Sequence, residues 1–344
     1  MPAGALPLAE SDIPPTTPAG LRQSAWTAYW RTGSLHSLAG SLSDDLDGPV
    51  RAFWEETFAL LMAQDRVIDI GTGNGPLPAL LCRLRGDAMP SVDAVDLAEV
   101  APVWLASSPP ACRRSVHFHG RTSAESLPFP DHHYSLAVSQ VGLEYTQLER
   151  SVAELGRVVR TDGRVALLVH HASSQLTRVA GEEVRLVDLL LSPDGLLAVA
   201  WDIYPYLALV AQGRSAQLSA DPQATRARHR FNDAMRDLQV QIAQSPYPDV
   251  LLDTRAFLVD WTRALAAGAA SLEQARQAHR DYQQALQDAA FRSRELCAHA
   301  LDEDGLAQLR ERFVANGFRV IECNLLHHGP MLIGWTLRAQ RAGD

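Results

Sequence analysis

Lysine is absent from this sequence, and arginine supplies all 31 of its basic side chains. Without lysine, the chain cannot form a Schiff base with a carbonyl substrate or use a buried amine as a general base. It also lacks the Gly-Lys-Ser/Thr sequence by which nucleotide triphosphatases hold phosphates. Any proton transfer must therefore come from His, Tyr, Asp or Glu.

Acidic residues outnumber basic ones, so the formal net charge is −9 and the isoelectric point is about 5.7. The chain therefore has no basic field that could attract nucleic acid. The one local concentration of positive charge, Arg226–Arg230, is interpreted as the solvated face of a helix. Nucleic acid is not an expected partner.

Cysteine and long apolar runs are also rare. The four cysteines are far apart and lack metal-ligand spacing, which indicates reduced thiols in a cytoplasmic protein and no metal site. The most apolar stretch, about residues 186–211, is interrupted by aspartates and prolines, so no membrane span is expected. The N-terminus has neither a positively charged start nor a sustained apolar run, so we expect no secretory signal there.

A glycine-rich segment is the most informative motif that is present. The apolar run Val67–Ile70 contains Asp69 and leads into Gly71, Gly73 and Gly75. Leucines at helical spacing follow it. This pattern predicts a buried strand that turns into a helix, through a loop where a ligand lies against backbone N–H groups.

The spacing of this motif excludes one common ligand. Dinucleotide-binding loops read G-x-G-x-x-G/A, but Pro76 occupies the position of the third glycine here. A carboxylate at Asp69 would repel a pyrophosphate, whereas it suits a ligand that carries an ammonium group. An NAD-dependent oxidoreductase is therefore disfavoured. That alternative would predict that NAD stabilises the protein against thermal unfolding.

A second acidic residue follows at the matching place. Ser91–Leu97 has the pattern of a buried strand that ends in Asp96, 25 positions after Gly71. This separation is close to the roughly 20 expected of a carboxylate that accepts hydrogen bonds from a ribose diol. The two carboxylate oxygens can accept from both hydroxyl groups at once.

Together, these motifs resemble those of class I S-adenosylmethionine-dependent methyltransferases, in particular the branch similar to ubiquinone and menaquinone methyltransferases. That branch reads Asp-Ala-Glu-x-Leu-Pro-Phe before its fourth strand, where this chain has Ser123–Phe129 with Ser in place of Asp. The resemblance implies S-adenosyl-L-methionine as the cofactor, and the Ser123 hydroxyl would accept from adenine more weakly than a carboxylate. The cofactor-binding residues that it implies are Asp69, Gly71, Thr72, Gly73, Gly75, Asp96, Leu97, Ser123, Ala124, Glu125 and Gln140.

The resemblance also implies the fold, a doubly wound α/β sheet of seven strands that is mostly parallel with one antiparallel strand. Later strands are expected near residues 134–139, 164–169, 319–326 and 331–338. Only His327–Pro330 joins the last two strands, so these must run antiparallel.

Four parts are expected along the chain. They are a disordered lead-in (1–20), N-terminal cap helices (21–60), a Rossmann-like methyltransferase core (61–171 and 301–340) and a helical lid or substrate insertion (172–300). Within the insertion, Ser271 and Gln274 form a capping pair that predicts the start of a long helix. A homodimer through the helical insertion is a further expectation.

Candidate catalytic residues follow the fourth and fifth strands. They are Tyr145, His170 and His171. Adjacent strand residues point to opposite faces, so at most one of the two histidines can face a pocket, where it would suit a general base. A hydrogen-bonded structural histidine is the alternative for either. The candidates for substrate binding are Tyr29, Trp30, His36, Trp201, Tyr204, Tyr206 and His327, although the three insertion aromatics could equally form the core of the lid.

These features predict methyl transfer to a small, partly apolar metabolite, mainly by positioning and desolvation, with histidine as an optional general base. Enzymes that methylate nucleic-acid amino groups resemble one another in an Asn/Asp-Pro-Pro-Tyr sequence after the fourth strand. This chain has Ser139–Gly142 there. The alternative is a non-catalytic, cofactor-binding protein with a regulatory or assembly role through its helical insertion.

Overall fold

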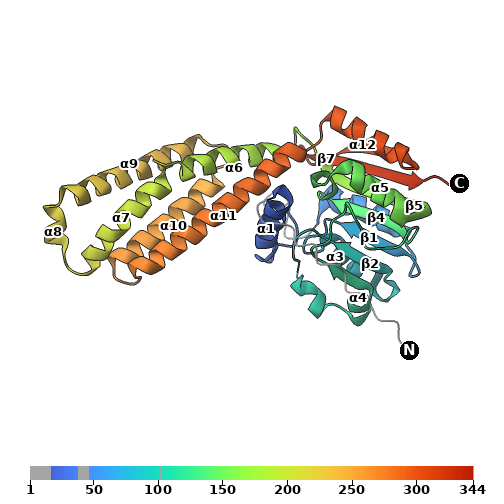
Figure 1. The fold of residues 1–344 in the computed structure, drawn as a ribbon, viewed down its shortest axis with the longest axis horizontal. Helices are drawn as coiled ribbons and strands as arrows, with labels where there is room; N and C mark the ends of the chain where they lie inside the picture. Colours follow the sequence, from blue (N-terminus) through green and yellow to red (C-terminus); the bar gives the residue numbers. More distant parts are fainter. Residues whose placement is uncertain (1–16, 38–45, 101, 344) are drawn as a thin grey trace. The chain divides into compact units, whose positions relative to one another are not determined.

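The chain forms a seven-stranded sheet flanked by helices in a computed structural model that describes residues 17–37, 46–100 and 102–343 (Figure 1). The strands are β1 (Arg66–Ile70), β2 (Ser91–Val95), β3 (Val116–His119), β4 (Tyr134–Gln140), β5 (Val159–His170), β6 (Phe318–His328) and β7 (Met331–Arg341). Their order is β3-β2-β1-β4-β5-β7-β6. Strands β1 to β5 pair in parallel, whereas β7 runs antiparallel to both of its neighbours. The predicted fold class is confirmed.

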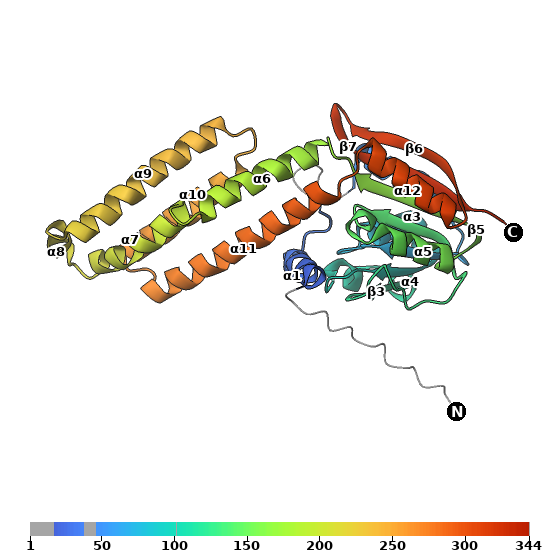
Figure 2. The ribbon, with the colours of Figure 1, turned by 45° about the horizontal axis from the view of Figure 1, so that its top comes forward.

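Helices cover both faces of the sheet, because adjacent residues of a buried strand point to opposite sides. One hydrophobic core contains Val67 of β1 and residues of α2 (Gly48–Ala59), α3 (Pro76–Arg85) and α4 (Pro110–Ser115). The other contains Ile68 of β1 and residues of α5 (Leu148–Val158) and α12 (Glu303–Ala315). Figure 2 shows α5 and α12 next to each other on their face of the sheet.

The loops that follow the parallel strands emerge at one edge of the sheet. Short 3-10 turns lie in three of the connections: η1 (Gly86–Ala88), η2 (Val103–Ser107) and η3 (Leu143–Tyr145). The glycine loop follows β1, the Asp96 segment follows β2 and η3 follows β4. The topology therefore brings these three segments to the same edge.

The N-terminal helix begins earlier than expected. α1 spans Pro18–Trp30, and the Thr17 hydroxyl caps it by accepting from the Gly20 N–H at 3.1 Å. Residues 18–20, which we placed in a disordered lead-in, are therefore helical, and residues 1–16 lie outside the described part of the chain.

Strand β5 also begins earlier than the sequence pattern indicated. We expected it to start near Arg164, but it follows α5 directly at Val159. Asp162 has a positive φ of 61°, and the register with β4 shifts between Tyr134 and Leu136. The first part of the strand therefore contains a local irregularity.

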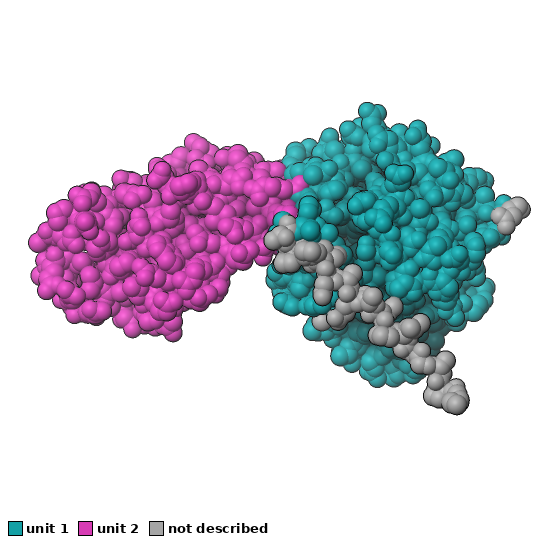
Figure 3. Space-filling view, viewed as in Figure 1, with its two compact units in different colours: residues 1–178, 295–344 teal, residues 179–294 magenta. Residues whose placement is uncertain are grey.

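Residues 179–294 form a separate helical unit, and residues 1–178 with 295–344 form the unit that holds the sheet (Figure 3). The helical unit contains most of α6 (Gln175–Leu191) and α11 (Leu272–His299), together with α7 (Leu196–Ala211), α8 (Ser215–Ser219), α9 (Pro222–Gln244) and α10 (Asp249–Ala266). It has a hydrophobic core of its own. At the start of α11, the Ser271 N–H donates to Gln274 Oε1 at 2.8 Å and the Gln274 N–H donates to Ser271 Oγ at 3.2 Å, as the capping pair predicted.

Candidate functional site

A crevice lies at the carboxyl ends of β1, β2 and β4, where Ile70, Val95 and Gln140 form part of its lining. Ligands of open α/β sheets bind at this edge. The residues that we predicted from the sequence and that line the crevice are Trp30, His36, Gly71, Thr72, Asp96, Leu97, Ser123, Ala124, Glu125, Gln140 and Tyr145. The fold thus brings most of the predicted cofactor-binding residues together.

The glycine loop lies so close to its neighbours that a side chain would not fit at two of its positions. Gly71 has a φ of 67°, and a Cβ at this position would lie 2.8 Å from the Cα of Gly142. Gly73 has a φ of 54°, and a Cβ there would lie 2.5 Å from the Trp30 ring. Gly73 and Gly75 do not belong to the crevice lining. They shape the loop, and Gly71 with Thr72 forms the part of it that lines the crevice.

Asp69 lies beneath the loop rather than in the crevice lining. Its side chain is buried and accepts a hydrogen bond from the Thr72 hydroxyl at 2.6 Å. Burial raises the pKa of Asp69 to about 7, the Thr72 hydrogen bond opposes this shift, and the nearby Asp96 carboxylate adds to it. In the structure its carboxylate holds Thr72, and direct contact of Asp69 with a ligand stays a prediction.

Asp96 is both buried and part of the crevice lining. Its Oδ2 accepts the N–H of Gly73 and its Oδ1 accepts the N–H of Ala98, each at 2.8 Å. Burial raises the pKa of Asp96 to about 6, against the lowering effect of these two hydrogen bonds. Each oxygen keeps a further acceptor site, so the carboxylate can still bind two hydroxyl groups.

The Ser123–Glu125 segment forms another wall of the crevice. Ser123 Oγ accepts the Glu125 N–H at 3.2 Å and keeps one acceptor site. Glu125 Oε1 accepts the N–H of Gln147 at 2.9 Å, just before α5. The segment is therefore anchored to the start of this helix.

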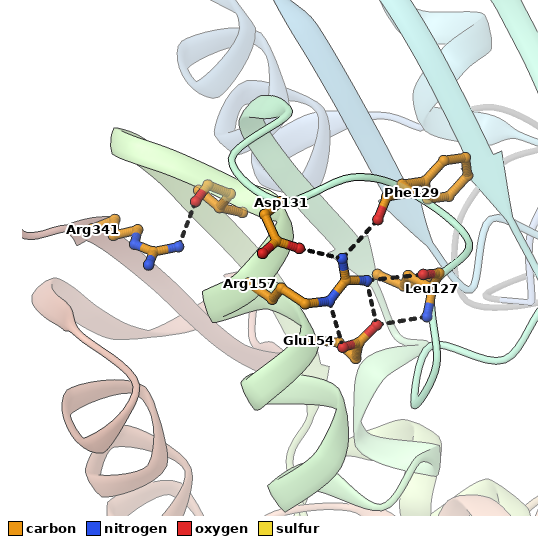
Figure 4. Close-up of polar contacts among 7 residues, drawn as sticks. Leu127, Phe129, Asp131, Glu154, Arg157 and Arg341 are labelled. Carbon is orange, nitrogen blue, oxygen red and sulfur yellow. Dashed lines mark hydrogen bonds and ion pairs between the residues drawn. The ribbon is translucent and has the colours of Figure 1, made fainter.

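Arg157 and Glu154 of α5 hold the continuation of the same loop (Figure 4). The Arg157 guanidinium donates to the carbonyl oxygens of Leu127 and Phe129, at 2.9 and 2.7 Å, and to the carboxylate of Asp131 at 2.8 Å. Glu154 accepts two hydrogen bonds from Arg157, at 2.8 and 2.7 Å, and a third from the Leu127 N–H at 2.7 Å. Our sequence analysis missed this pair, although an acid and an arginine three residues apart on a predicted helix are a signal for it.

The end of β4 places Gln140 in the crevice with a defined amide orientation. The indole N–H of Trp54, in α2, donates to Gln140 Oε1 at 2.6 Å. Because an indole nitrogen only donates, the bond assigns Oε1 and leaves the amide nitrogen as the group available for a ligand. Trp54 is fully buried. No local pattern indicated this contact, since the two residues are 86 positions apart.

One face of α1 also lines the crevice, and our sequence analysis missed most of it. This face carries Arg22, Gln23, Trp26 and Trp30. Trp26 stacks on Trp30 with ring centroids 5.5 Å apart, and it meets Tyr145 edge to face at 5.9 Å. The spacing of residues 22, 26 and 30 and the Thr17-Pro18 start are helical signals that would have revealed this face.

The predicted catalytic residues separate into one that lines the crevice and two that do not. Tyr145 lines it, and burial, followed by the nearby Glu144 carboxylate, raises the pKa of its hydroxyl well above the usual value. His170 is buried outside the lining, and burial lowers its pKa to about 4. His171 stacks on Trp335, and its Nδ1 accepts the Ser173 N–H at 2.8 Å. Both histidines thus lie outside the crevice lining.

Several residues expected to bind substrate lie elsewhere. The Tyr29 hydroxyl donates to the His36 carbonyl at 3.1 Å, so Tyr29 supports the crevice wall without lining it. His327 is exposed in the β6–β7 hairpin and does not line the crevice. Tyr204 is fully buried in the core of the helical unit, where its hydroxyl lies 3.1 Å from His279 Nδ1.

The other two insertion aromatics have no place in the crevice lining. Trp201 packs edge to face on His279, and the Arg276 guanidinium lies 5.1 Å from its ring centroid. Tyr206, on the same helix α7, is partly exposed. A role of Trp201 and Tyr206 in substrate binding stays a prediction, whereas Tyr204 belongs to the core of the helical unit.

Comparisons with known proteins match the part of the chain that carries this geometry. The sequence profile of a family described as a methyltransferase domain matches residues 68–167. The ubiquinone/menaquinone biosynthesis C-methyltransferase UbiE of Teredinibacter turnerae is 25% identical over 200 residues, which cover 55% of this chain and 71% of that protein. The uncharacterized methyltransferase YcgJ of Bacillus subtilis is 31% identical over 112 residues, which cover 32% of this chain and 42% of that protein.

One solved structure, a SAM-dependent methyltransferase from Methanosarcina mazei, has a TM-score of 0.40 at 15% identity, over 87% of this chain and 100% of that one. This structural likeness is distant and adds no argument to the sequence matches. The chain spans less than half the length of the Bacillus relative. The matched family region contains both the glycine loop and Asp96.

Proposed function

We infer that this chain, which carries a class I S-adenosylmethionine-dependent methyltransferase domain over residues 68–167, transfers a methyl group from S-adenosylmethionine to a small, partly apolar metabolite. The observation that carries the proposal is Asp96, a buried crevice carboxylate with acceptor capacity on both oxygens and bare glycine backbone beside it. This combination fits an adenosyl group with its ribose diol.

The crevice residues fit S-adenosylmethionine, the cofactor of this class of domain. Asp96 would accept from the ribose, Ser123 and Ala124 would contact the adenine edge, and Gly71 with Thr72 would meet the amino-acid end. The Asp69 carboxyl under Thr72 adds an acidic group below that end. When bound, S-adenosylmethionine supplies an activated methyl group on a positively charged sulfur.

With an activated donor, the protein has to align the reactants and exclude water. Trp26, Trp30 and Tyr145 form an aromatic wall that serves both purposes. The Gln140 amide nitrogen is a fixed donor at the end of β4. The residues of this chain therefore contribute mainly by position.

A histidine general base stays a separate hypothesis, since His170 and His171 lie outside the crevice lining. We expect His170→Ala and His171→Ala to leave the pH dependence of turnover unchanged. A large loss of turnover at and above neutral pH in either variant, together with a weaker dependence on pH and with wild-type cofactor affinity, would restore the histidine base.

The acceptor class is proposed from the chemistry of the lining. Arg22 is the one arginine among the described residues that line the crevice, and Tyr145, Glu295 and His299 already occupy its nitrogens. The wall is otherwise rich in aromatic rings, and the chain is acidic overall. An uncharged or weakly polar small molecule fits this lining better than a phosphorylated one.

The alternative is a cofactor-binding protein without turnover, and Ser123 is the observation that favours it. It replaces the aspartate that this branch of methyltransferases carries at the adenine, so cofactor could bind in a weakened way. Calorimetry with S-adenosylmethionine tests binding, and Asp96→Asn should weaken it by about tenfold or more. Release of S-adenosylhomocysteine with candidate acceptors then separates the two functions. Absence of binding by the wild type would contradict both.

The role of the helical insertion, residues 172–300, stays a prediction. If it is a lid, S-adenosylmethionine together with an acceptor should slow proteolysis within it, and unchanged cleavage would contradict the idea. A homodimer through this insertion and a cytoplasmic location also remain predictions. Within the described ranges, no helix combines the length and the apolar character needed to cross a membrane.

A further inference from the structure

We propose that Arg22 is a positioning residue: it fixes the aromatic face of α1 against the Tyr145 turn and makes this geometry depend on the last turns of α11. The proposal rests on the proposed function, because it takes the crevice to bind S-adenosylmethionine. It concerns residues of the sheet unit, which includes the end of α11 from Glu295 onward.

Arg22 uses each of its guanidinium nitrogens. Nη1 donates to the carbonyl oxygen of Tyr145, and Nε donates to the carboxylate of Glu295. Nη2 lies 3.1 Å from Nε2 of His299. The side chains of Arg22 and Glu295 are only 20% and 19% exposed, so solvent screens this ion pair weakly. One side chain thus connects α1, the turn after β4 and the end of α11.

Tyr145, like Arg22 itself, lines the crevice, and its ring contacts several neighbours. Trp26 of α1 meets it at a centroid distance of 5.9 Å and His299 of α11 at 5.6 Å. His170, at the end of β5, lies 6.1 Å away on another side. Because these neighbours come from three elements, a shift of α1 or α11 has to move the ring or lose contact with it.

The two helices that lead into the helical unit are anchored differently. At the start of α6, the Thr177 hydroxyl donates to the His171 carbonyl at 2.8 Å, and neither residue lines the crevice. At the end of α11, Glu295 and His299 contact Arg22, which does line it. Of these two contacts, only the one at the end of α11 involves a residue of the crevice lining.

Loss of the Arg22 contacts should loosen the crevice without unfolding the sheet. None of the described residues of α1 belongs to either hydrophobic core of the sheet unit. The helix is held instead by its rings and by polar contacts such as those of Arg22. A variant of Arg22 should thus affect cofactor affinity more than global stability.

The test is calorimetric titration of S-adenosylmethionine into the full-length wild type, Arg22→Met, Glu295→Gln and the double variant, with Tm measured for each. We expect Kd to rise by about tenfold in Arg22→Met, since charge-assisted hydrogen bonds to two segments are lost. Glu295→Gln should raise Kd in the same direction, and the double variant should bind no more weakly than Arg22→Met, because the two residues act as a unit. With an acceptor in hand, KM for the cofactor should rise more than kcat falls.

Arg31→Met is the matched control. Arg31 is the C-cap of the same helix and pairs with Glu99 at 2.7 Å, but its side chain is 71% exposed and it does not line the crevice. Its Kd should stay within about twofold of wild type, because exposed ion pairs contribute little.

Three results would overturn the proposal. Wild-type Kd in Arg22→Met with a lowered Tm would mean that Arg22 is only structural. Wild-type Kd in Glu295→Gln would remove the link to α11, and this variant of nearly unchanged volume carries the test if Arg22→Met does not fold. Failure of the wild type itself to bind S-adenosylmethionine would instead overturn the proposed function, and the inference with it.

Discussion

Trp54 donates its indole N–H to Oε1 of Gln140 at 2.6 Å, and this single bond connects α2 to the crevice. Both side chains are buried, so the bond is shielded from competing water. The amide of Gln140 is thereby held in one orientation at the end of β4. The position of a fully buried tryptophan outside the crevice thus determines which polar group of Gln140 is free toward the crevice.

Replacement Trp54→Phe should weaken S-adenosylmethionine binding by about threefold to tenfold, because Gln140 loses the partner that orients it. Calorimetric Kd values measure the effect. Phe58→Leu is the control, since Phe58 stacks on Trp54 at 6.0 Å and is buried in the same core. It should lower Tm without changing Kd. Equal Kd values for Trp54→Phe and wild type would show that the amide needs no fixed partner.

Local patterns predicted the glycine loop and the acid after β2. The apolar pattern of the two strands, the glycine loop between them and the spacing from Gly71 determine where Asp96 lies. Parallel strands end at one edge of the sheet, and the chain has little freedom between them. The same reasoning placed Gln140 and Ser123 in the crevice. It did not predict that the Asp69 side chain lies under the loop and accepts from Thr72, because the pattern of a strand does not reveal what its last residues contact.

Contacts between distant segments could not be predicted from these patterns. Arg22 and Tyr145 are 123 positions apart, and Arg22 and Glu295 are 273 apart. Nothing local in the sequence connects such residues, and only packing of the folded chain brings them together. Tyr204 illustrates an ambiguity of local patterns: an aromatic residue of the insertion could bind a ligand or fill the core of its own unit, and the structure shows it in that core.

The Arg157–Glu154 pair should control the adenine end of the crevice. Arg157→Met removes the donors to the Leu127 and Phe129 carbonyl oxygens and should raise the Kd of S-adenosylmethionine by about tenfold, because the loop after Glu125 loses its anchor. The Kd of 5′-methylthioadenosine, which lacks the amino-acid end, should rise by a similar factor. A change confined to S-adenosylmethionine would contradict the assignment of this loop to adenine.

Arg85→Met is a suitable control for that experiment. Arg85 also donates to backbone carbonyl oxygens, those of Phe58, Ala59 and Leu61 at the end of α2, and it does not line the crevice. Arg85→Met should lower the free energy of unfolding by about as much as Arg157→Met does, on the order of 1–3 kcal/mol, and leave both Kd values unchanged. The comparison separates a loss of stability from a loss of loop position.

Cofactor binding should release protons between about pH 6 and pH 8. Burial raises the pKa of Asp69 to about 7 and that of Asp96 to about 6, so both are partly protonated in this range when the crevice lacks a cation. A bound ammonium and sulfonium favour the ionised carboxylates and lower both pKa values. The complex then holds fewer protons than the free protein, so affinity should rise with pH. Calorimetry in buffers of different ionisation enthalpy measures the release.

Asp69→Asn tests which acid is responsible. The amide can still accept from Thr72 but does not titrate, so most of the proton release near pH 7 should disappear, while Asp96 continues to contribute nearer pH 6. Affinity independent of pH in the wild type would mean that neither carboxyl group senses the charge of the cofactor.

His279 should make the helical unit sensitive to acid. Its side chain is fully buried among Trp201, Tyr204 and Phe257, and burial lowers its pKa from 6.5 to about 4. The folded pKa lies below the unfolded one, so between these values the unfolded chain binds more protons and stability falls as the pH falls. At pH 5 the free energy of unfolding should be about 2 kcal/mol lower than at neutral pH.

Because burial also lowers the pKa of His170 in the sheet unit to about 4, the measurement must report on the helical unit alone. The measurement is hydrogen exchange of α7, α10 and α11 at pH 7 and pH 5. It compares the wild type with a Tyr204→Phe/His279→Leu variant, in which neither member of this pair is left buried without the other. Faster exchange of these helices at pH 5 in wild type but not in the variant is the expected result, whereas equal acceleration in both would assign the acid sensitivity to another group.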